Sequence, residues 1–494
     1  MQNLTLKQKL NQMFICGYKN ANPFVNPLFL ELVQNNLGGV IFFSENLTSR
    51  KSFKQTVNDL KALNKRLFLS IDQEGGLVER TVMLDEKIEY ITPKALNTLK
   101  NPDEIKQHYD ILCQDLSDLG LNMNFAPVVD VNTNPYNPII GVRAFSDNPK
   151  EVIERAKIVL ESFKEHNIFS VAKHFPGHGA AGVDSHLDMP VIEDDFENFY
   201  KTHLVCFEET LKNGVNGIMI AHVHYSFFDK ENLPASLSKN IVGKYLKNTL
   251  KSDALVFSDD MVMGGIAKHF GLFEAVKAGI EAGIEVFLFR DTTQELISAL
   301  NQIEAYALEN SDFKAKIEAA FAKISAVKDN FLQTNDDSKE FDINKNREII
   351  AKITQNTVII NKKGSLLPLV PQKKYLLVAF DTNNVFNLSF NKLSPAECLQ
   401  EFDVEEIKFS LNPDSAEIEK ISDMLHNDST VIFISYNAHI NRGQIKLFEK
   451  IKVPKILIST GLDYDIQVLK DADTVITSNC FKYGSIKQIA KILK

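Results

Sequence analysis

Tryptophan is absent from the 494 residues, and no apolar run approaches the roughly 20 residues that a membrane-spanning helix needs. The lack of tryptophan disfavours a surface aromatic platform for long polysaccharides. Cysteine is scarce, and the five cysteines are odd in number and widely spread. This pattern predicts free buried thiols in a reducing compartment and argues against a disulfide framework.

Basic character is also lacking. The chain has 55 Lys and Arg against 64 Asp and Glu, a formal net charge of -9, and no basic run. Nucleic acid is therefore not expected as a partner. The first ten residues are polar and show no apolar core of a signal peptide, so we expect a cytoplasmic protein with no membrane partner. These features leave open whether it is a monomer or a homodimer.

Short apolar runs alternate with amphipathic stretches over roughly the first 330 residues, which predicts parallel strands joined by helical crossovers. About eight such units predict a (β/α)8 TIM-type barrel. The predicted strands are residues 12–17, 38–43, 66–71, 123–129, 168–172, 217–220, 254–257 and 286–289.

A polar, charged stretch from Leu332 to Lys345 predicts a boundary. We expect a catalytic barrel at 1–335, a linker and connecting helix at 336–350, and a smaller C-terminal α/β domain with a layered sheet at 351–494. Strands of that second domain are predicted at residues 357–361, 375–380, 430–435, 455–459 and 474–477.

One stretch concentrates ionisable side chains. Between positions 173 and 188 it holds one lysine, three histidines and two aspartates, and it follows the buried strand predicted to end at Ala172. Pro176 and three glycines predict that the chain opens into a loop there. Loops at the ends of buried strands are where α/β enzymes keep their chemistry.

Two kinds of chemistry fit this loop. His174 and His178 have the spacing of a zinc-binding helix, but Pro176 between them argues against a helical turn and the glutamate of an HExxH motif is absent. Asp184 and His186 instead suit a general acid/base, because a carboxylate can fix one imidazole tautomer and stabilise its charged form.

Ionisable residues follow several of the predicted strands. A barrel gathers the carboxyl ends of its strands on one face, so we expect these residues to surround one pocket. They are Asp72, Asp130, His174, His222 and Asp259.

Five ordered sequence blocks resemble glycoside hydrolase family 3, and more narrowly its bacterial β-N-acetylglucosaminidase (NagZ-type) branch. The resemblance covers residues 1 to about 340, and residues 359–369 are similar to the start of the family's second domain. The blocks are Asp72-Gln73-Glu74-Gly75-Gly76, Gly141-Val142-Arg143-Ala144-Phe145, Lys173-His174-Phe175-Pro176-Gly177-His178-Gly179, Asp184-Ser185-His186 and Phe257-Ser258-Asp259-Asp260-Met261.

The resemblance implies a retaining exo-β-N-acetylglucosaminidase that releases terminal GlcNAc from small muropeptide-derived sugars in peptidoglycan recycling, without a metal or organic cofactor. It implies that Asp259 is the nucleophile and that His186, held by Asp184, is the acid/base. The substrate-binding residues that it implies are Asp72, Arg143, Lys173 and His174 on the sugar hydroxyls, Arg80 at the border, and His178 and His222 in the pocket wall, with Asp130 as a support.

Four alternatives remain open at this point. A substrate-assisted mechanism would need Asp259 and Asp260 to act as a pair, although adjacent residues of an extended segment point in opposite directions. A phosphorylase on the same scaffold would also tolerate a histidine acid/base. A metal-dependent amidohydrolase would use the pair His222 and His224, and a non-catalytic sugar-binding protein would need none of this chemistry.

Overall fold

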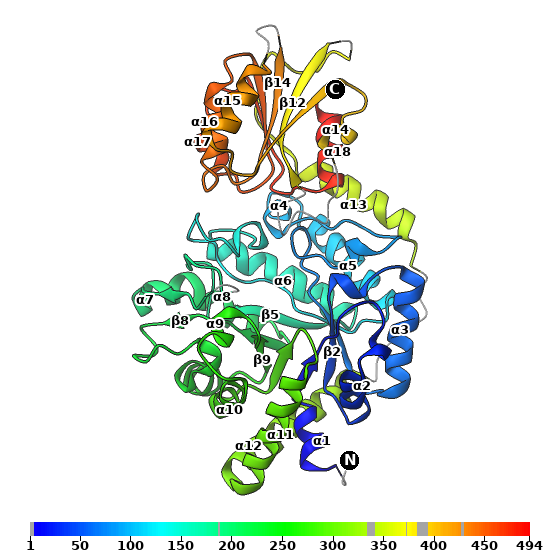
Figure 1. The fold of residues 1–494 in the computed structure, drawn as a ribbon, viewed down its shortest axis with the longest axis vertical. Coiled ribbons are helices and arrows are strands. Elements are labelled where there is room, and N and C mark those ends of the chain that lie inside the picture. The colour runs from blue at the N-terminus through cyan, green and yellow to red at the C-terminus, as the bar shows by residue number, and fades with distance from the viewer. Residues whose placement is uncertain (1–3, 186–187, 333–340, 372, 383–393, 426–428) are drawn as a thin grey trace.

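The protein is described by a computed structural model that covers residues 4–185, 188–332, 341–371, 373–382, 394–425 and 429–494 (Figure 1). Eight parallel strands close into a barrel in the order β1-β10-β9-β7-β5-β4-β3-β2, which confirms the predicted barrel. They are β1 (Phe14–Cys16), β2 (Gly39–Phe42), β3 (Phe68–Ile71), β4 (Met123–Asn124), β5 (Phe169–Phe175), β7 (Gly217–Ile220), β9 (Leu255–Asp260) and β10 (Val286–Phe289).

Helices surround the barrel (Figure 1). The α-helices are α1 (Leu6–Asn11), α2 (Pro27–Gln34), α3 (Arg50–Leu63), α4 (Pro93–Leu96), α5 (Pro102–Asp118), α6 (Pro149–Glu165), α7 (Phe196–Phe199), α8 (Val205–Lys212), α9 (Gly264–Ala267), α10 (Leu272–Ala282), α11 (Gln294–Glu309) and α12 (Ser311–Phe331). Shorter or wider helical segments are η1 (Pro23–Val25), η2 (Ser44–Asn46), η3 (Thr81–Met83), η4 (Gly141–Arg143), η5 (Tyr200–Leu204), η6 (Ala235–Leu237) and η7 (Lys239–Thr249), and a small sheet joins β6 (Val191–Ile192) to β8 (His224–Tyr225).

Helix α6 illustrates how the sequence specifies these elements. Asn148 caps its first turn through a hydrogen bond to the Lys150 amide, and Pro149 follows as the first helical residue. Val152, Ala156, Val159 and Phe163 recur at helical spacing and are buried. This apolar stripe packs the helix onto the barrel, whose strands are themselves buried on both faces, as is usual for parallel sheets.

The second domain is a six-stranded sheet with helices on its faces, and it confirms the predicted smaller α/β domain. Its order is β11-β16-β15-β14-β12-β13, and the edge strand β11 is antiparallel to its neighbour. Its elements are α13 (Ile343–Thr357), β11 (Ile359–Lys362), β12 (Lys374–Phe380), α14 (Pro395–Cys398), β13 (Asp403–Phe409), α15 (Ser415–Asp423), β14 (Thr430–Ser435), α16 (Gly443–Lys450), β15 (Lys455–Ser459), α17 (Asp465–Val468), β16 (Thr474–Thr477) and α18 (Tyr483–Ile492).

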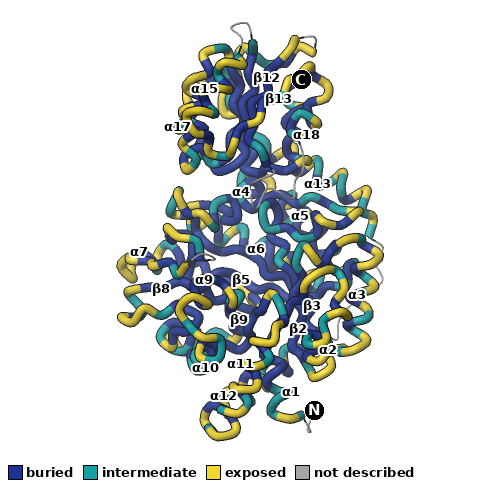
Figure 2. Tube along the Cα trace, in the orientation of Figure 1, coloured by how far each residue is buried: buried dark blue, intermediate teal, exposed yellow. Residues whose placement is uncertain are grey.

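Each domain has its own apolar core, and Figure 2 shows the buried interior of each. The two cores are in contact through individual side chains. Cys480 of the second domain belongs to the barrel core, and Leu77 of the barrel packs against the core of the second domain. Helix α13 crosses the boundary predicted at 350, and most of the predicted linker lies outside the described residues.

Several predicted elements differ from those observed. Strand β5 continues to Phe175, so the prediction that it ends at Ala172 was wrong, and Lys173 and His174 belong to the strand. Strand β4 contains only two residues, and the Ala126 amide beyond it turns to the Asn124 carbonyl instead of a neighbouring strand. Strand β13 was not predicted. Among the described residues, no helix is both long and apolar enough to span a membrane.

Candidate active site

The strand ends that hold the predicted residues lie at the same level of the barrel. Phe175 of β5 is in register with Ile220 of β7, and Ile220 is in register with Ser258 of β9. His174 therefore precedes this level by one residue and Asp259 follows it by one. Each is the last residue but one of its strand, and a strand holds side chains more rigidly than a loop does.

A chain of alternating charges lies between β3 and β5. The ammonium of Lys173 is 2.7 Å from Asp72 and 2.6 Å from Glu74. Glu74 also accepts two hydrogen bonds of 2.8 Å from the guanidinium of Arg143, which η4 presents from the loop after β4. Asp72 keeps 17% of its side chain exposed, whereas Glu74 keeps 1%. Asp72 is thus free to meet a ligand, while Glu74 holds the two cations in place.

Glu74 was not among the predicted site residues, although it belongs to the Asp72–Gly76 block. Burial opposes its charge, but Arg143 and Lys173 outweigh burial and hold the pKa of Glu74 well below its usual range. Burial lowers the pKa of Lys173, but the charges of Asp72 and Glu74 outweigh burial and raise it. Glu74 and Lys173 therefore stay charged at neutral pH, which suits charge-assisted hydrogen bonds in this network.

Asp130 organises the two histidines of the β5 end. One carboxylate oxygen lies 2.7 Å from Nδ1 of His174, and the other accepts the His178 amide at 2.6 Å. Nε2 of His174 lies 3.4 Å from the Arg143 guanidinium, which can only donate. His174 thus donates from Nδ1 and accepts at Nε2. Burial, and then the nearby His174, lower the pKa of His178 to about 4, so its ring is neutral at pH 7.

The loop that carries Asp184 is attached to the loop after β9. The Gly265 amide donates to the Ser185 carbonyl at 3.1 Å, and Nε2 of His269 lies 2.8 Å from Asp188. His186 itself lies outside the described residues. The residues on either side of it, Ser185 and Asp188, nevertheless bring this part of the β5 loop beside the segment that follows Asp259.

Asp259 and Asp260 are consecutive but have different surroundings. Oδ1 of Asp260 accepts the backbone amides of Val262 and Arg290, each at 3.3 Å, and Asp259 accepts the Asp260 amide at 2.8 Å. Burial, and to a lesser degree the neighbouring Asp259 charge, raise the pKa of Asp260 to about 7. One of two adjacent carboxylates is therefore held by backbone groups and partly protonated at neutral pH.

His222 is placed differently from the pocket wall that the resemblance implied. The side chain has no exposed surface, Nε2 lies 3.1 Å from the Asp260 carbonyl, and Nδ1 lies 2.8 Å from the Ser236 hydroxyl. His222 is therefore a buried residue that holds the backbone at the end of β9 through the Asp260 carbonyl. His224 is also turned away, toward the Leu233 carbonyl.

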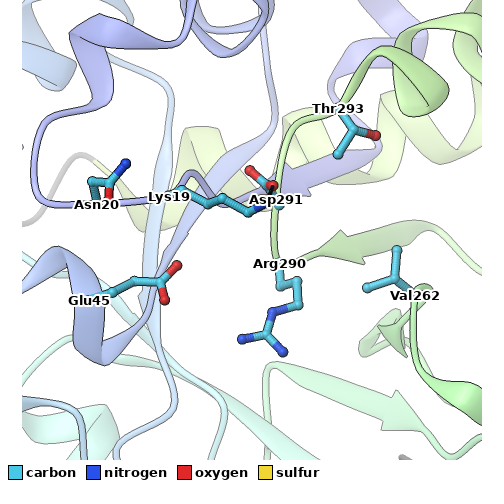
Figure 3. A pocket seen from close by; sticks show the side chains of 7 residues that line it. All are labelled: Lys19, Asn20, Glu45, Val262, Arg290, Asp291 and Thr293. Carbon is cyan, nitrogen blue, oxygen red and sulfur yellow. Dashed lines mark ion pairs between the residues drawn. The ribbon is translucent and has the colours of Figure 1, made fainter.

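A hollow of about 470 Å³ opens between the loops that follow β1, β2, β9 and β10, and Figure 3 shows its lining. Arg290 extends into it away from Asp291 (Figure 3). Its guanidinium lies 5.2 Å from the Phe43 ring, and the Arg80 guanidinium lies 5.5 Å from the same ring. Arg80 in turn lies 3.8 Å from Asp72. Arg290 and Phe43 were not predicted, because neither belongs to a sequence block.

Metal chemistry receives no support from the arrangement. Within the described residues, no three His, Cys, Asp or Glu side chains gather in a way that could hold a metal ion. His174 and His178 are four residues apart, but Asp130 engages the ring of the former and the backbone amide of the latter.

Known proteins resemble this chain over most of its length. The family model for the glycosyl hydrolase family 3 N terminal domain matches residues 5–327. A β-hexosaminidase A of Pseudoalteromonas piscicida is 28% identical over 68% of this chain and 62% of its own length. A β-hexosaminidase of Tolumonas auensis is 30% identical over 54% of this chain and 80% of its own length. A family 3 β-N-acetylglucosaminidase structure from Paenibacillus superposes with a TM-score of 0.88, at 26% identity, over 99% of this chain and 97% of that one.

Proposed function

The chain belongs to glycosyl hydrolase family 3, and from that membership we propose that it is a retaining exo-β-N-acetylglucosaminidase. The observation that carries the proposal is the attachment of the Asp184 loop to the loop after Asp259, through Ser185 and Gly265. It joins the residue before His186, our candidate acid/base, to the segment that follows Asp259, our candidate nucleophile. The β-hexosaminidase relatives and the Paenibacillus structure support the same activity.

In this mechanism Asp259 attacks the anomeric carbon while His186 gives a proton to the leaving glycosidic oxygen. A covalent glycosyl-enzyme forms and the aglycone leaves. His186 then takes a proton from water, whose oxygen displaces Asp259 and restores both groups. Asp184 orients the imidazole and stabilises its charged form. A histidine suits proton transfer because an unperturbed imidazole titrates near neutral pH.

The charged network supplies the binding of the sugar. Asp72 and the cations beside it, Lys173 and Arg143, offer fixed donors and acceptors to hydroxyl groups, and Glu74 keeps the cations from moving. His174 borders this set. We place the leaving part of the substrate in the hollow beside Arg290, which lies directly after β10.

The natural substrate is proposed to be a small cell-wall saccharide with terminal β-GlcNAc, as the resemblance to the recycling branch of the family implies. A cytoplasmic location agrees with the five cysteines, all of which are buried and unpaired.

The test is turnover of an aryl β-GlcNAc and of a GlcNAc–anhydromuramic acid disaccharide. Asp259→Ala should abolish turnover of both while the protein stays folded, because the loss of a covalent nucleophile costs several kcal/mol and each 1.4 kcal/mol is about tenfold in rate. Near-normal turnover would remove Asp259 from the mechanism. Release of GlcNAc-1-phosphate when phosphate is added would show that the enzyme is a phosphorylase and would contradict the proposed hydrolysis.

The acid/base assignment is tested separately. His186→Ala should slow cleavage of the disaccharide far more than release of an activated phenol, which leaves almost without protonation. With the activated substrate, a burst of phenol should precede slow turnover as covalent enzyme accumulates. Equal losses on both substrates would send the search for the acid elsewhere.

A further inference from the structure

One contact of the second domain with the barrel involves a buried histidine. His439, in the segment between β14 and α16, places its Nε2 2.9 Å from the Pro135 oxygen in the loop after β4. Its other ring nitrogen lies 3.0 Å from the buried carboxylate of Asp465. The imidazole is 6% exposed and Asp465 is fully buried, so water does not compete strongly for this contact.

Both partners of the His439 ring are acceptors. A carbonyl oxygen can only accept, so Nε2 donates to Pro135, while Nδ1 faces the Asp465 carboxylate. Asp465 is fixed in turn by a 2.8 Å hydrogen bond from the Ser435 hydroxyl.

The residues on either side of Pro135 hold the β5 loop. Asn134 donates its amide hydrogen to the Gly179 carbonyl at 3.2 Å and its side chain to the Ala181 carbonyl at 3.0 Å. Asn137 donates its side chain to the His178 carbonyl at 2.9 Å. Three hydrogen bonds thus connect the segment around Pro135 to the segment that leads to Asp184.

We propose that His439 is a positioning residue, through which the second domain fixes the loop that carries the acid/base. The path runs from Asp465 to His439, to Pro135, and through Asn134 and Asn137 to residues 178–181. The proposal rests on the proposed function, since it assumes that Asp184 and His186 perform the proton transfers. It gives the second domain a part in catalysis without placing any of its side chains on the substrate.

The test compares two substrates with different need for a proton: N,N′-diacetylchitobiose and dinitrophenyl β-GlcNAc. His439→Phe keeps a ring between Tyr136 and Tyr464 but removes both ring nitrogens. Because small misplacement of a catalytic group can cost up to about a hundredfold, we expect kcat on the disaccharide to fall at least about tenfold more than kcat on the aryl glycoside. His439→Gln retains one donor for Pro135. It should therefore remove most of this difference between the two substrates.

Tyr464→Phe is the matched control, because it removes only a 3.4 Å hydrogen bond to Asp147 at the same interface. It should leave both rates unchanged. Asp465→Asn keeps the shape but removes the carboxylate that orients the His439 ring, so it should give a smaller split in the same direction even if His439→Phe folds poorly. Equal losses on both substrates in the His439 and Asp465 variants would overturn the proposal.

The outcome for His186→Ala separates this inference from the function on which it rests. If His186→Ala shows the leaving-group split and His439→Phe does not, only the positioning role fails. If neither shows it, the acid/base assignment itself fails.

Discussion

Glu74 shows how a residue that never meets the substrate can determine the site. It is the shared acceptor of Lys173 and Arg143, and all three side chains are almost fully buried. We expect Glu74→Gln to cost about 3–5 kcal/mol of folding free energy, because removing one partner leaves buried charges uncompensated. Differential scanning calorimetry against Glu86→Gln, an exposed carboxylate, measures the loss. An unchanged melting temperature would show that Asp72 suffices for both cations.

Asp260 predicts a pH dependence of stability. Its pKa is raised from an ordinary value of 3.8 to about 7, so the folded protein keeps a proton that the unfolded chain releases. Stability from this group is full below pH 3.8 and is lost as the pH rises toward 7. Asp260→Asn should therefore stabilise the protein at pH 8, by on the order of 2 kcal/mol, and have little effect at pH 4. Denaturant unfolding at both pH values decides, and an equal effect at both would contradict the raised pKa.

The sequence predicted most of the charged residues of the site but not their connections. Asp72, Lys173 and Arg143 stand in recognisable blocks, whereas the role of Glu74 depends on two partners far apart in the chain. Arg290 and Phe43 meet only because the barrel closes, so no local pattern could reveal them. The same closure places His222 beneath β9, where its ring has no exposed surface.

At the scale of elements, the loop after β5 packs closely against the loop after β4. A Cβ on Gly179 would lie 1.7 Å from the Val131 carbonyl oxygen, whereas one on Gly182 would meet only the Asn134 side chain at 3.9 Å. Gly179→Ala should therefore displace the loop and lower kcat by about a hundredfold, while Gly182→Ala should not. Steady-state kinetics on the disaccharide tests this pair. Full activity of Gly179→Ala would mean that the loops after β4 and β5 can move apart without lowering kcat.

The predicted strands were right where apolar runs were complete and wrong where buried polar residues continued them. Strand β5 extends to Phe175 because Lys173 pairs with Asp72 and His174 bonds to Asp130, both on neighbouring loops. Hydrophobicity alone cannot register that compensation. Strand β13 went unpredicted because, as an edge strand, it has many exposed charged residues and lacks an apolar run.

At the scale of the whole molecule, a buried ion pair joins the domains. Lys482 lies 3.0 Å from Glu79, whose side chain has no exposed surface. Lys482→Met should lower stability by about 3 kcal/mol, because the buried Glu79 would keep the Tyr90 amide but lose its charged partner. Burial already raises the pKa of Glu79 to about 7, so the loss should be greater at pH 8 than at pH 5, where the carboxyl is protonated.

Calorimetry of Lys482→Met and of the double variant Glu79→Gln/Lys482→Met checks this prediction. The double variant should recover most of the stability, because it removes both charges together. If the double variant is as unstable as the single one, packing at the interface rather than charge determines the effect.

The contacts of the loop after β3 have a consequence for synthesis on the ribosome. Thr92 donates to the Asn479 carbonyl at 2.6 Å, Glu89 accepts the Gly484 amide at 2.9 Å, and Glu79 pairs with Lys482. Nearly four hundred residues separate these partners along the chain. At about 5–20 residues per second, the nascent barrel waits tens of seconds with Glu79 unpaired and part of its core uncovered. During that interval the emerging polypeptide presents to chaperones the same loop that carries Asp72 and Glu74.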